Sequence, residues 1–251
     1  MILKYYLNNF IYLAWLDLKI RYRNTLLGPF WSTISLGVTL IILGFVWTKV
    51  LNADHYKYVP NLYFGYIFWV WISDTLSDSV TVFGDNKDII HNFNFPLFYL
   101  NFKIIIKNFL IFLHNFPIIL IIIYIYNIEL GFNNIFFIIS IFLTLTLLFS
   151  ISIIISIMCA FYDDFKQATL IFLKIIFYTT PILWLPEMLG DKQFLLFYNP
   201  FFHIIELLRN TLTAPILAIN SFMMVIYMNI ITSIISIIIY KIFNKKVIHW
   251  I

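Results

Sequence analysis

The chain has 251 residues, of which 62% are hydrophobic and 11% are charged, and its formal net charge at pH 7 is +4. A typical soluble domain carries about 25% charged residues, so this chain has too few to cover a surface that faces water. The composition excludes an ordinary soluble enzyme and predicts an integral membrane protein. Its cations are scattered among apolar segments, so no nucleic-acid partner is expected. The single cysteine, Cys159, excludes an internal disulfide.

The first predicted element is an amphipathic helix over residues 4–27, whose apolar residues recur at spacings of three and four. Lys19 and Arg23 lie opposite the apolar face. Asp17 and Arg21, spaced i,i+4 with the acid first, are predicted to form an ion pair. Such a helix is expected to lie on the cytoplasmic leaflet, and a membrane anchor with no further role is the alternative. The apolar face consists of Leu7, Phe10, Ile11, Ala14, Trp15, Leu18 and Tyr22.

Six apolar stretches follow that are each long enough to cross a bilayer, which needs about 20 helical residues. They are too long for barrel strands, so they are predicted to be helices. The first begins after the Gly28-Pro29 step, because proline is tolerated in a first helical turn. The six predicted spans are residues 30–50, 59–83, 104–126, 135–161, 168–185 and 216–243.

Lysine and arginine are distributed unevenly between the two sides of these spans. Eleven of them fall on the side of the two termini and four fall on the other side. Cytoplasmic segments carry an excess of these cations. The sequence therefore predicts six transmembrane helices with both termini in the cytoplasm.

The cytoplasmic connection between the second and third spans is unusually apolar. An exposed apolar cluster of this kind usually marks a contact site for a partner, and a helix folded back against the membrane is the alternative. The residues expected to form the contact surface are Asp88, Ile89, Ile90, Phe93, Phe95 and Pro96.

The outer segment between the fifth and sixth spans is too short to cross the membrane and too apolar for a free loop. It is predicted to be a re-entrant or interfacial helix. Asn199 is expected to cap that helix, Pro200 to occupy its first position and Pro215 to end it. Glu206 and Arg209, spaced i,i+3, are predicted to pair.

Ionisable groups inside a membrane are costly and are candidates for function. Asp74 and Asp78 on the second span and Lys174 on the fifth lie at similar depths, so Lys174 is predicted to pair with one of these acids, within one chain or between two copies of it. Separate hydration of the three groups at a channel mouth is the alternative. His114 and Asn115 lie near the middle of the third span, where His114 is expected to bond between helices rather than to relay protons.

Five motifs, in this order, resemble the ABC-2 type permeases that export polysaccharides such as O-antigen, capsule and teichoic acid. They are "DLKIRYRNTLLGPFW" before the first span, Phe95-Pro96 after the second, "FLHN" in the third, "TPILW" at the end of the fifth and "NPFFHIIELLRN" before the sixth.

This resemblance implies a permease subunit that works as a homodimer with two copies of a separate ABC ATPase subunit in the cytoplasmic (inner) membrane of a bacterium. The cargo would be a polysaccharide on polyprenyl diphosphate, such as O-antigen. ATP and magnesium would bind to the ATPase, and this chain would hold no cofactor and no metal.

The resemblance also implies a single transmembrane domain over residues 1–251, with an ATPase-coupling segment at 84–103 and a re-entrant segment at 186–215. The ATPase-coupling residues would be Asp17, Lys19, Arg21 and Arg23 together with the six residues of the contact surface. The candidates for the translocation path or its gate are Asp74, Asp78, His114, Asn115, Lys174, Pro181, Asn199, Pro200, Glu206 and Arg209.

The chain has no GxxxxGK[ST] phosphate loop, so it is not expected to hydrolyse ATP or to be an enzyme. Two other functions stay open on the sequence. One is an ABC-2 permease for drugs or lipids. The other is a membrane-embedded transferase for lipid-linked sugars, in which Asp163 and Asp164 near Asp85 and Asp88 would hold a divalent metal beside a diphosphate.

Overall fold

The computed structural model describes residues 2–23, 25–28, 30–93, 95–129, 135–213, 218–248 and 250, with side chains from residue 9 onward. All regular structure in these ranges is helical, and no strand occurs in them. The prediction of an all-α protein is therefore confirmed.

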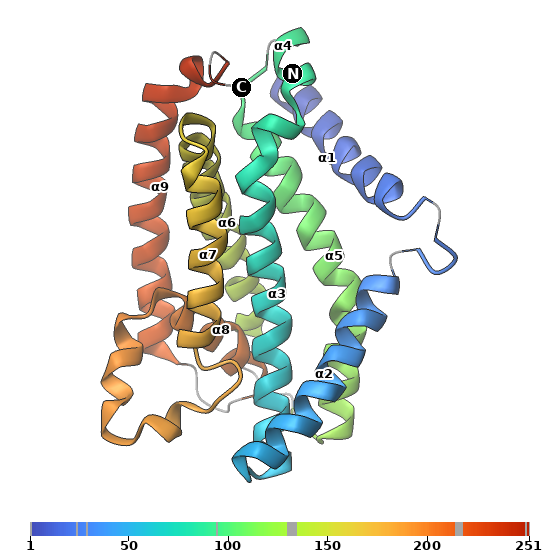
Figure 1. Cartoon of the computed structure of the whole chain (residues 1–251), viewed down its shortest axis with the longest axis vertical. Helices are drawn as coiled ribbons and strands as arrows, with labels where there is room; N and C mark the ends of the chain where they lie inside the picture. Colours follow the sequence, from blue (N-terminus) through green and yellow to red (C-terminus); the bar gives the residue numbers. More distant parts are fainter. Residues whose placement is uncertain are drawn as a thin grey trace.

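Four helices are long and apolar enough to cross a membrane. Two further helices run beside them (Figure 1) but are more polar or shorter: α3 has 31 residues and α7 has 16. An integral membrane protein is thus supported by both composition and helix length. The four apolar helices are α2 (Phe30–Leu51), α5 (Phe98–Ile125), α6 (Ile135–Phe161) and α9 (Ile219–Val247), and the other two are α3 (His55–Asp85) and α7 (Asp164–Thr179).

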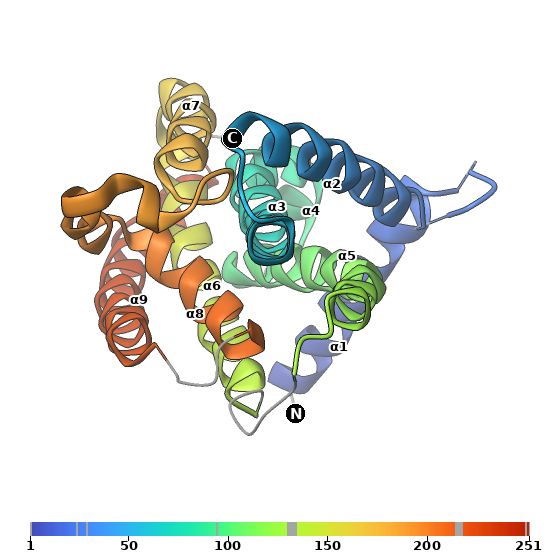
Figure 2. The same cartoon turned by 90° about the horizontal axis from the view of Figure 1, so that it is seen from below.

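Helix α3 lies at the centre of the bundle, surrounded by α2, α5, α6, α7 and α8, as Figure 2 shows. Its side chains are buried on every face, including Phe64, Phe68 and Leu76. Burial on several faces is expected of a helix in the interior of a bundle. The four apolar helices expose apolar residues on one side, as helices facing lipid do.

Small polar residues join α6 to its neighbours. Ser79 Oγ of α3 donates to Ser152 Oγ at 2.8 Å. Asn101 Nδ2 of α5 donates to Ser152 Oγ and to Ser156 Oγ, both at 2.9 Å. On its other face, α6 bonds α9 through Thr146 and Asn229. Short side chains allow helices to approach closely, and hydroxyl groups bond across the contact.

The two ends of the bundle are built differently. One end carries the short helix α4 (Lys87–Asn92), the N-terminal part of α1 (Ile2–Arg21) and the C-terminal end of α9 (Figure 1). The opposite end carries α8 (Pro200–Thr213) and η2 (Pro186–Tyr198), a 3₁₀ segment that is kinked at Gly190, where φ is +52°. Glycine adopts this left-handed conformation without a steric penalty.

Three predicted boundaries were wrong. Helix α1 ends at Arg21, six residues before the predicted end at 27, and Gly28 follows in a left-handed conformation with φ +56°. Helix α5 begins at Phe98, within the segment predicted to be a connection. Helix α7 ends at Thr179 because Thr180 precedes Pro181 and is extended, with ψ 138°. Pro29 and Pro215, predicted to start one helix and to end another, lie outside the described residues.

Gly44 permits the close approach of α2 to α3. A methyl carbon at this position would lie 2.5 Å from Tyr63 Oη and 2.8 Å from Tyr63 Cε1. We expect Gly44→Ala to lower the free energy of unfolding by about 1–3 kcal/mol, because the Tyr63 ring must move. Thermal unfolding of the purified protein measures this.

Gly37 on the same helix provides the matched control for Gly44. A methyl carbon there would meet only Ile118 Cδ1, at the ordinary distance of 3.9 Å, so Gly37→Ala should leave the unfolding temperature unchanged. In a Tyr63→Ala background the penalty of Gly44→Ala should vanish, since the clashing atoms are gone. A penalty that persists there would contradict the proposed contact.

Candidate functional site

The N-terminal helix packs on α5 and exposes its cations. Phe10, Ala14 and Leu18 are buried, whereas Lys19, Arg21 and Arg23 are exposed. Ile11 and Trp15, which were predicted to belong to the same apolar face, are exposed by 44% and 45%. The helix therefore buries a narrower stripe than its sequence predicts.

The predicted ion pair between Asp17 and Arg21 is wrong. Asp17 Oδ2 lies 2.9 Å from Lys103 Nζ of α5. The i,i+4 spacing allows the local pair, but α1 lies along α5, and a buried ammonium from the neighbouring helix takes the carboxylate. Arg21 lies over the ring of Tyr22 instead, 5.8 Å from its centroid.

The coupling segment divides into an exposed part and a buried part. Asp88 and Pro96 are exposed, and the Phe93 side chain is 67% exposed. Ile90 is only 5% exposed, because it packs in an apolar cluster with Phe10, Val82, Tyr99 and other residues. The prediction that Ile90 forms the contact surface is wrong, and Ile89 and Phe95 are half-buried.

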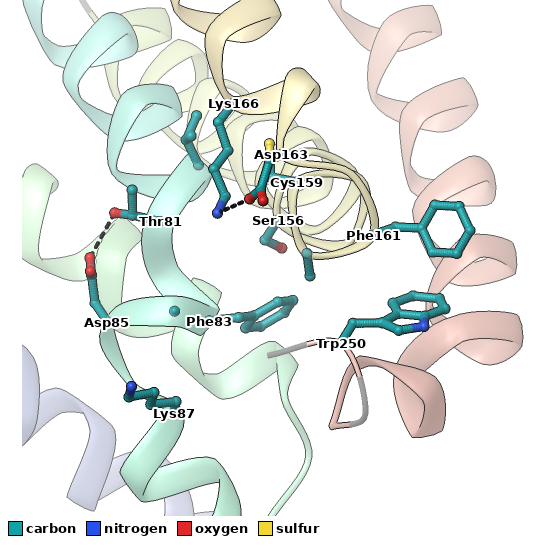
Figure 3. Close-up of a pocket in the computed structure, with 13 residues that line it drawn as sticks. Thr81, Phe83, Asp85, Lys87, Ser156, Cys159, Phe161, Asp163, Lys166 and Trp250 are labelled. Carbon is teal, nitrogen blue, oxygen red and sulfur yellow. Dashed lines mark hydrogen bonds and ion pairs between the residues drawn. The ribbon is translucent and has the colours of Figure 1, made fainter.

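A pocket of about 480 Å³ lies beside this segment (Figure 3). It is formed by the ends of α3 and α6, the start of α4 and the residues that lead into α7. Lys166 Nζ and Asp163 Oδ1 pair across 2.6 Å on one side, and Thr81 Oγ1 donates to Asp85 Oδ2 at 2.6 Å on another. Trp250 closes a third side, where its ring meets the ring of Phe161 edge to face with the two centroids 4.4 Å apart.

Sequence reasoning did not find this pocket, because its walls come from segments far apart in the chain. The pocket bears on the transferase hypothesis, in which Asp163 and Asp85 would be among the metal ligands. Asp163 is engaged by Lys166, and Asp85 accepts from Thr81. Among the described residues, no three His, Cys, Asp or Glu side chains come together as a metal site.

A second hollow, of about 410 Å³, forms a groove between α3 and α7. Asp74 and Lys174 both line it, without an ion pair between them among the described contacts. The rest of its lining combines aromatic, aliphatic and small polar side chains, from Tyr66, Trp69, Val70, Ser73, Ser77, Leu170, Leu173, Phe177 and Tyr178.

Asp78 does not meet Lys174 within this chain, so the prediction of that pair within one protomer is wrong, whereas a pair between two copies stays a prediction. Asp78 Oδ2 lies 2.7 Å from Lys107 Nζ and accepts from Asn108 Nδ2 at 2.8 Å. Both partners belong to α5, which packs against the opposite side of α3 from α7 (Figure 2). The prediction rested on matching depth alone, and depth does not say which helices face each other.

The polar pair in α5 behaves differently from the prediction. His114 Nδ1 lies 2.7 Å from Leu110 O of its own helix, so this side chain does not bond between helices in the described contacts. The interhelical bonds come from Thr33 Oγ1 of α2, which reaches His114 O at 2.8 Å and Asn115 Oδ1 at 3.1 Å. A buried Asn115 is what links α5 to α2.

At the end of the bundle that carries α8 and η2, the predicted cap and ion pair both form. Asn199 Oδ1 accepts from the backbone N–H groups of Phe201 and Phe202, at 3.0 and 3.2 Å, and Pro200 is the first residue of α8. Arg209 pairs with Glu206, and its Nη1 donates to Pro181 O at 3.4 Å. The Arg209 side chain is 5% exposed. The bond from Arg209 to Pro181 O therefore ties α8 to the turn after α7.

Comparison with known proteins was decisive for the family. The sequence model of the family described as "ABC-2 type transporter" matches residues 8–213. This chain belongs to the ABC-2 type transporter family. The match extends from residue 8 in α1 to the end of α8 and so includes α4, the α3–α7 groove and the capped helix α8.

Three curated relatives of this ABC-2 chain carry the name O-antigen export system permease protein RfbA. Two from Klebsiella pneumoniae are 25% and 26% identical over 73% of this chain and 72% of their own length. One from Myxococcus xanthus is 20% identical over 70% of this chain and 68% of its own length. An ABC-2 chain is a transport subunit rather than an enzyme, and the family implies a partner ABC ATPase.

Proposed function

We propose that this ABC-2 chain is the permease that exports a polyprenyl-diphosphate-linked polysaccharide, such as O-antigen, across the cytoplasmic membrane of a bacterium. The observation that carries the proposal is its similarity to the O-antigen export permeases over about 73% of its length. The partner ATPase would supply ATP and magnesium chemistry, two copies of it serving a homodimer of this chain.

The proposed topology has six spans, with α3 and α7 added to the four apolar helices. It is supported by the course of these two helices beside the others and by the position of α4 and the ends of α1 and α9 at one end of the bundle (Figure 1). The excess of lysine and arginine at this end supports its proposed cytoplasmic position. Helix α8 and η2 would then form the outer re-entrant segment of a single transmembrane domain.

The proposed ATPase-docking surface is the exposed cytoplasmic part of α1 and α4. Lys19 and Arg23 contribute positive charge, and Asp88 and Phe93 contribute an acid and an exposed aromatic ring. The 480 Å³ pocket beside α4 would accept a side chain of the partner, since charged, polar and apolar side chains all line it. Aromatic residues are enriched where protein interfaces are strongest.

The proposed cargo path runs along the groove between α3 and α7. Trp69 and Tyr178 offer rings on which sugars can stack, and Lys174 offers a cation for the diphosphate. Lys174 is exposed in the single subunit, and a charge so deep in a membrane span needs a polar surrounding. A path shared with a second copy would provide it.

A gene deletion tests the proposed function directly. In a strain of the host that lacks this permease, we expect full-length lipid-linked polysaccharide to accumulate on the cytoplasmic side and to disappear from the cell surface. Loss of polymer synthesis would instead support the transferase alternative. A normal surface polysaccharide would contradict the proposal and leave a drug or lipid exporter.

Charge reversal in the groove tests the cargo path. Lys174→Glu places a second carboxylate beside Asp74, so we expect export of the anionic lipid-linked glycan to fall about tenfold or more. Surface glycan per cell, normalised to permease in the membrane, measures this. Lys241→Glu, at an exposed position of α9 outside the groove, should change export less than about twofold. Equal losses in the two variants would remove Lys174 from the path.

A further inference from the structure

Lys103 joins three elements of the cytoplasmic end through one ammonium group. It lies in the second turn of α5, and its side chain is only 8% exposed. Its Nζ is 2.9 Å from Asp17 Oδ2 of α1 and donates to Asn86 Oδ1 at 2.9 Å. The sequence gives no sign of this contact, because the three residues are far apart in the chain.

Asn86 is the single residue between α3 and α4. Its backbone N–H bonds to Phe83 O at the end of α3, and its side-chain Nδ2 donates to Val82 O at 2.7 Å. The other polar atom of this side chain, Asn86 Oδ1, accepts the hydrogen bond from Lys103 Nζ. The side chain of Asn86 thus connects the last turn of α3 to Lys103, at the point where the chain turns into α4.

Apolar contacts hold α1 against the same region. The ring of Phe10 stacks on Tyr99 of α5, with centroids 5.2 Å apart and planes 10° from parallel. It also meets Phe95 of the coupling segment at 5.2 Å. Val82 and Ile90 belong to the same buried cluster. The polar and the apolar contacts therefore join the same elements.

The burial of Lys103 makes this junction sensitive to geometry. A buried ammonium is strongly unfavourable unless it is paired and hydrogen-bonded. The Lys103 ammonium needs both the Asp17 carboxylate and the Asn86 amide oxygen as partners, and these come from different elements. Displacement of α1 or of the α3–α4 junction would leave the charge buried with fewer partners. The two elements are therefore favoured to move together.

We infer that Lys103 is a positioning residue that couples α1 to the α3–α4 junction, so that force applied to α4 is passed to the N-terminal helix. The inference rests on the proposed function for the source of that force, an ATPase partner. The rigid connection itself is a property of the permease alone. The two parts can be tested separately.

The connection is tested with spin labels on the permease alone, reconstituted in lipid nanodiscs. In a Cys159→Ala background, labels at Tyr12→Cys of α1 and His91→Cys of α4 occupy exposed positions. We expect one narrow distance distribution in this parent and in Lys103→Arg, which retains a donor for each acceptor. Lys103→Met keeps the apolar stem but loses both bonds, and should broaden the distribution at least twofold. An unchanged distribution in Lys103→Met would overturn the inference.

The coupling is tested on the complex with its ATPase, without the labels. We expect Lys103→Met to keep ATPase binding and basal ATP hydrolysis but to lower glycan exported per ATP hydrolysed about tenfold. Lys103→Arg should restore most of that ratio, and Lys241→Met, with an exposed lysine, should not change it. Equal losses of hydrolysis and export would show a merely structural role and overturn the coupling. If the wild-type complex exports no glycan, the proposed function fails, while the distances in nanodiscs still decide whether Lys103 makes the connection.

Discussion

Replacing Glu206 by alanine is expected to lower the free energy of unfolding by about 3–5 kcal/mol. The change leaves the guanidinium of Arg209 without its carboxylate, although its side chain is only 5% exposed. The remaining bond to Pro181 O, at 3.4 Å, is too long to compensate. Thermal and denaturant unfolding of the purified protein in a fixed detergent measure the loss.

The outer end also contains the matched control for this ion pair. Lys57 Nζ and Glu187 Oε1 lie 2.9 Å apart, but both side chains are 62% exposed. Glu187→Ala should cost less than about 1 kcal/mol, because water solvates the free lysine. Combining Glu206→Ala with Arg209→Met should cost less than the sum of the single changes, since no buried charge remains. Equal effects at Glu187 and Glu206 would contradict the role of burial.

Replacing Phe93 by alanine is expected to weaken binding of the ATPase subunit about 30-fold, or ~2 kcal/mol. Phe93 directly follows α4 and is 67% exposed. A ring so exposed at the proposed cytoplasmic end would remove much apolar surface from water when a partner covers it. The affinity of the purified ATPase for the permease in nanodiscs, measured at one salt concentration, gives the result.

Phe142 on α6 controls for the loss of an exposed ring. Its side chain is 65% exposed, nearly as much as that of Phe93, but it lies on a membrane-spanning helix. Phe142→Ala should therefore leave ATPase affinity unchanged. If both variants bind the ATPase as the wild type does, Phe93 is not part of the docking surface. If both bind it equally weakly, the loss comes from the membrane domain as a whole.

Two features that depend on neighbouring residues in the chain were predicted correctly. Asn199 caps α8 because its side chain reaches backbone N–H groups two and three residues ahead. Glu206 and Arg209 pair because i,i+3 spacing places them on one face of a helix. The end of α7 was predicted too late. The apolar sequence continues past Pro181, but a residue that precedes a proline disfavours the helical conformation, so the helix ends before it.

Features that depend on which helices touch could not be read from the chain. Asp17 has a suitable local partner in Arg21, but it pairs with Lys103, and Asp78 pairs with Lys107 rather than Lys174. In a membrane domain almost every helix is apolar on most faces, so hydropathy does not distinguish the neighbours of one helix from those of another. Ile90 was misplaced for the same reason: an apolar residue in a connection can serve a partner or the core.

The sequence by itself determined that this protein is a helical membrane protein and where most of its helices lie, because the cost of unpaired backbone groups in lipid leaves an apolar segment little choice but to be helical. It also carried the motifs that resemble the permease family. Only the tertiary structure decided the partners of the intramembrane and cytoplasmic charges, the groove that holds Asp74 and Lys174, and the junction at Lys103. Each of these features depends on how the helices pack. Short-range contacts between segments that are far apart in the chain select one arrangement of the helices, and with it one ion pair among several of similar energy.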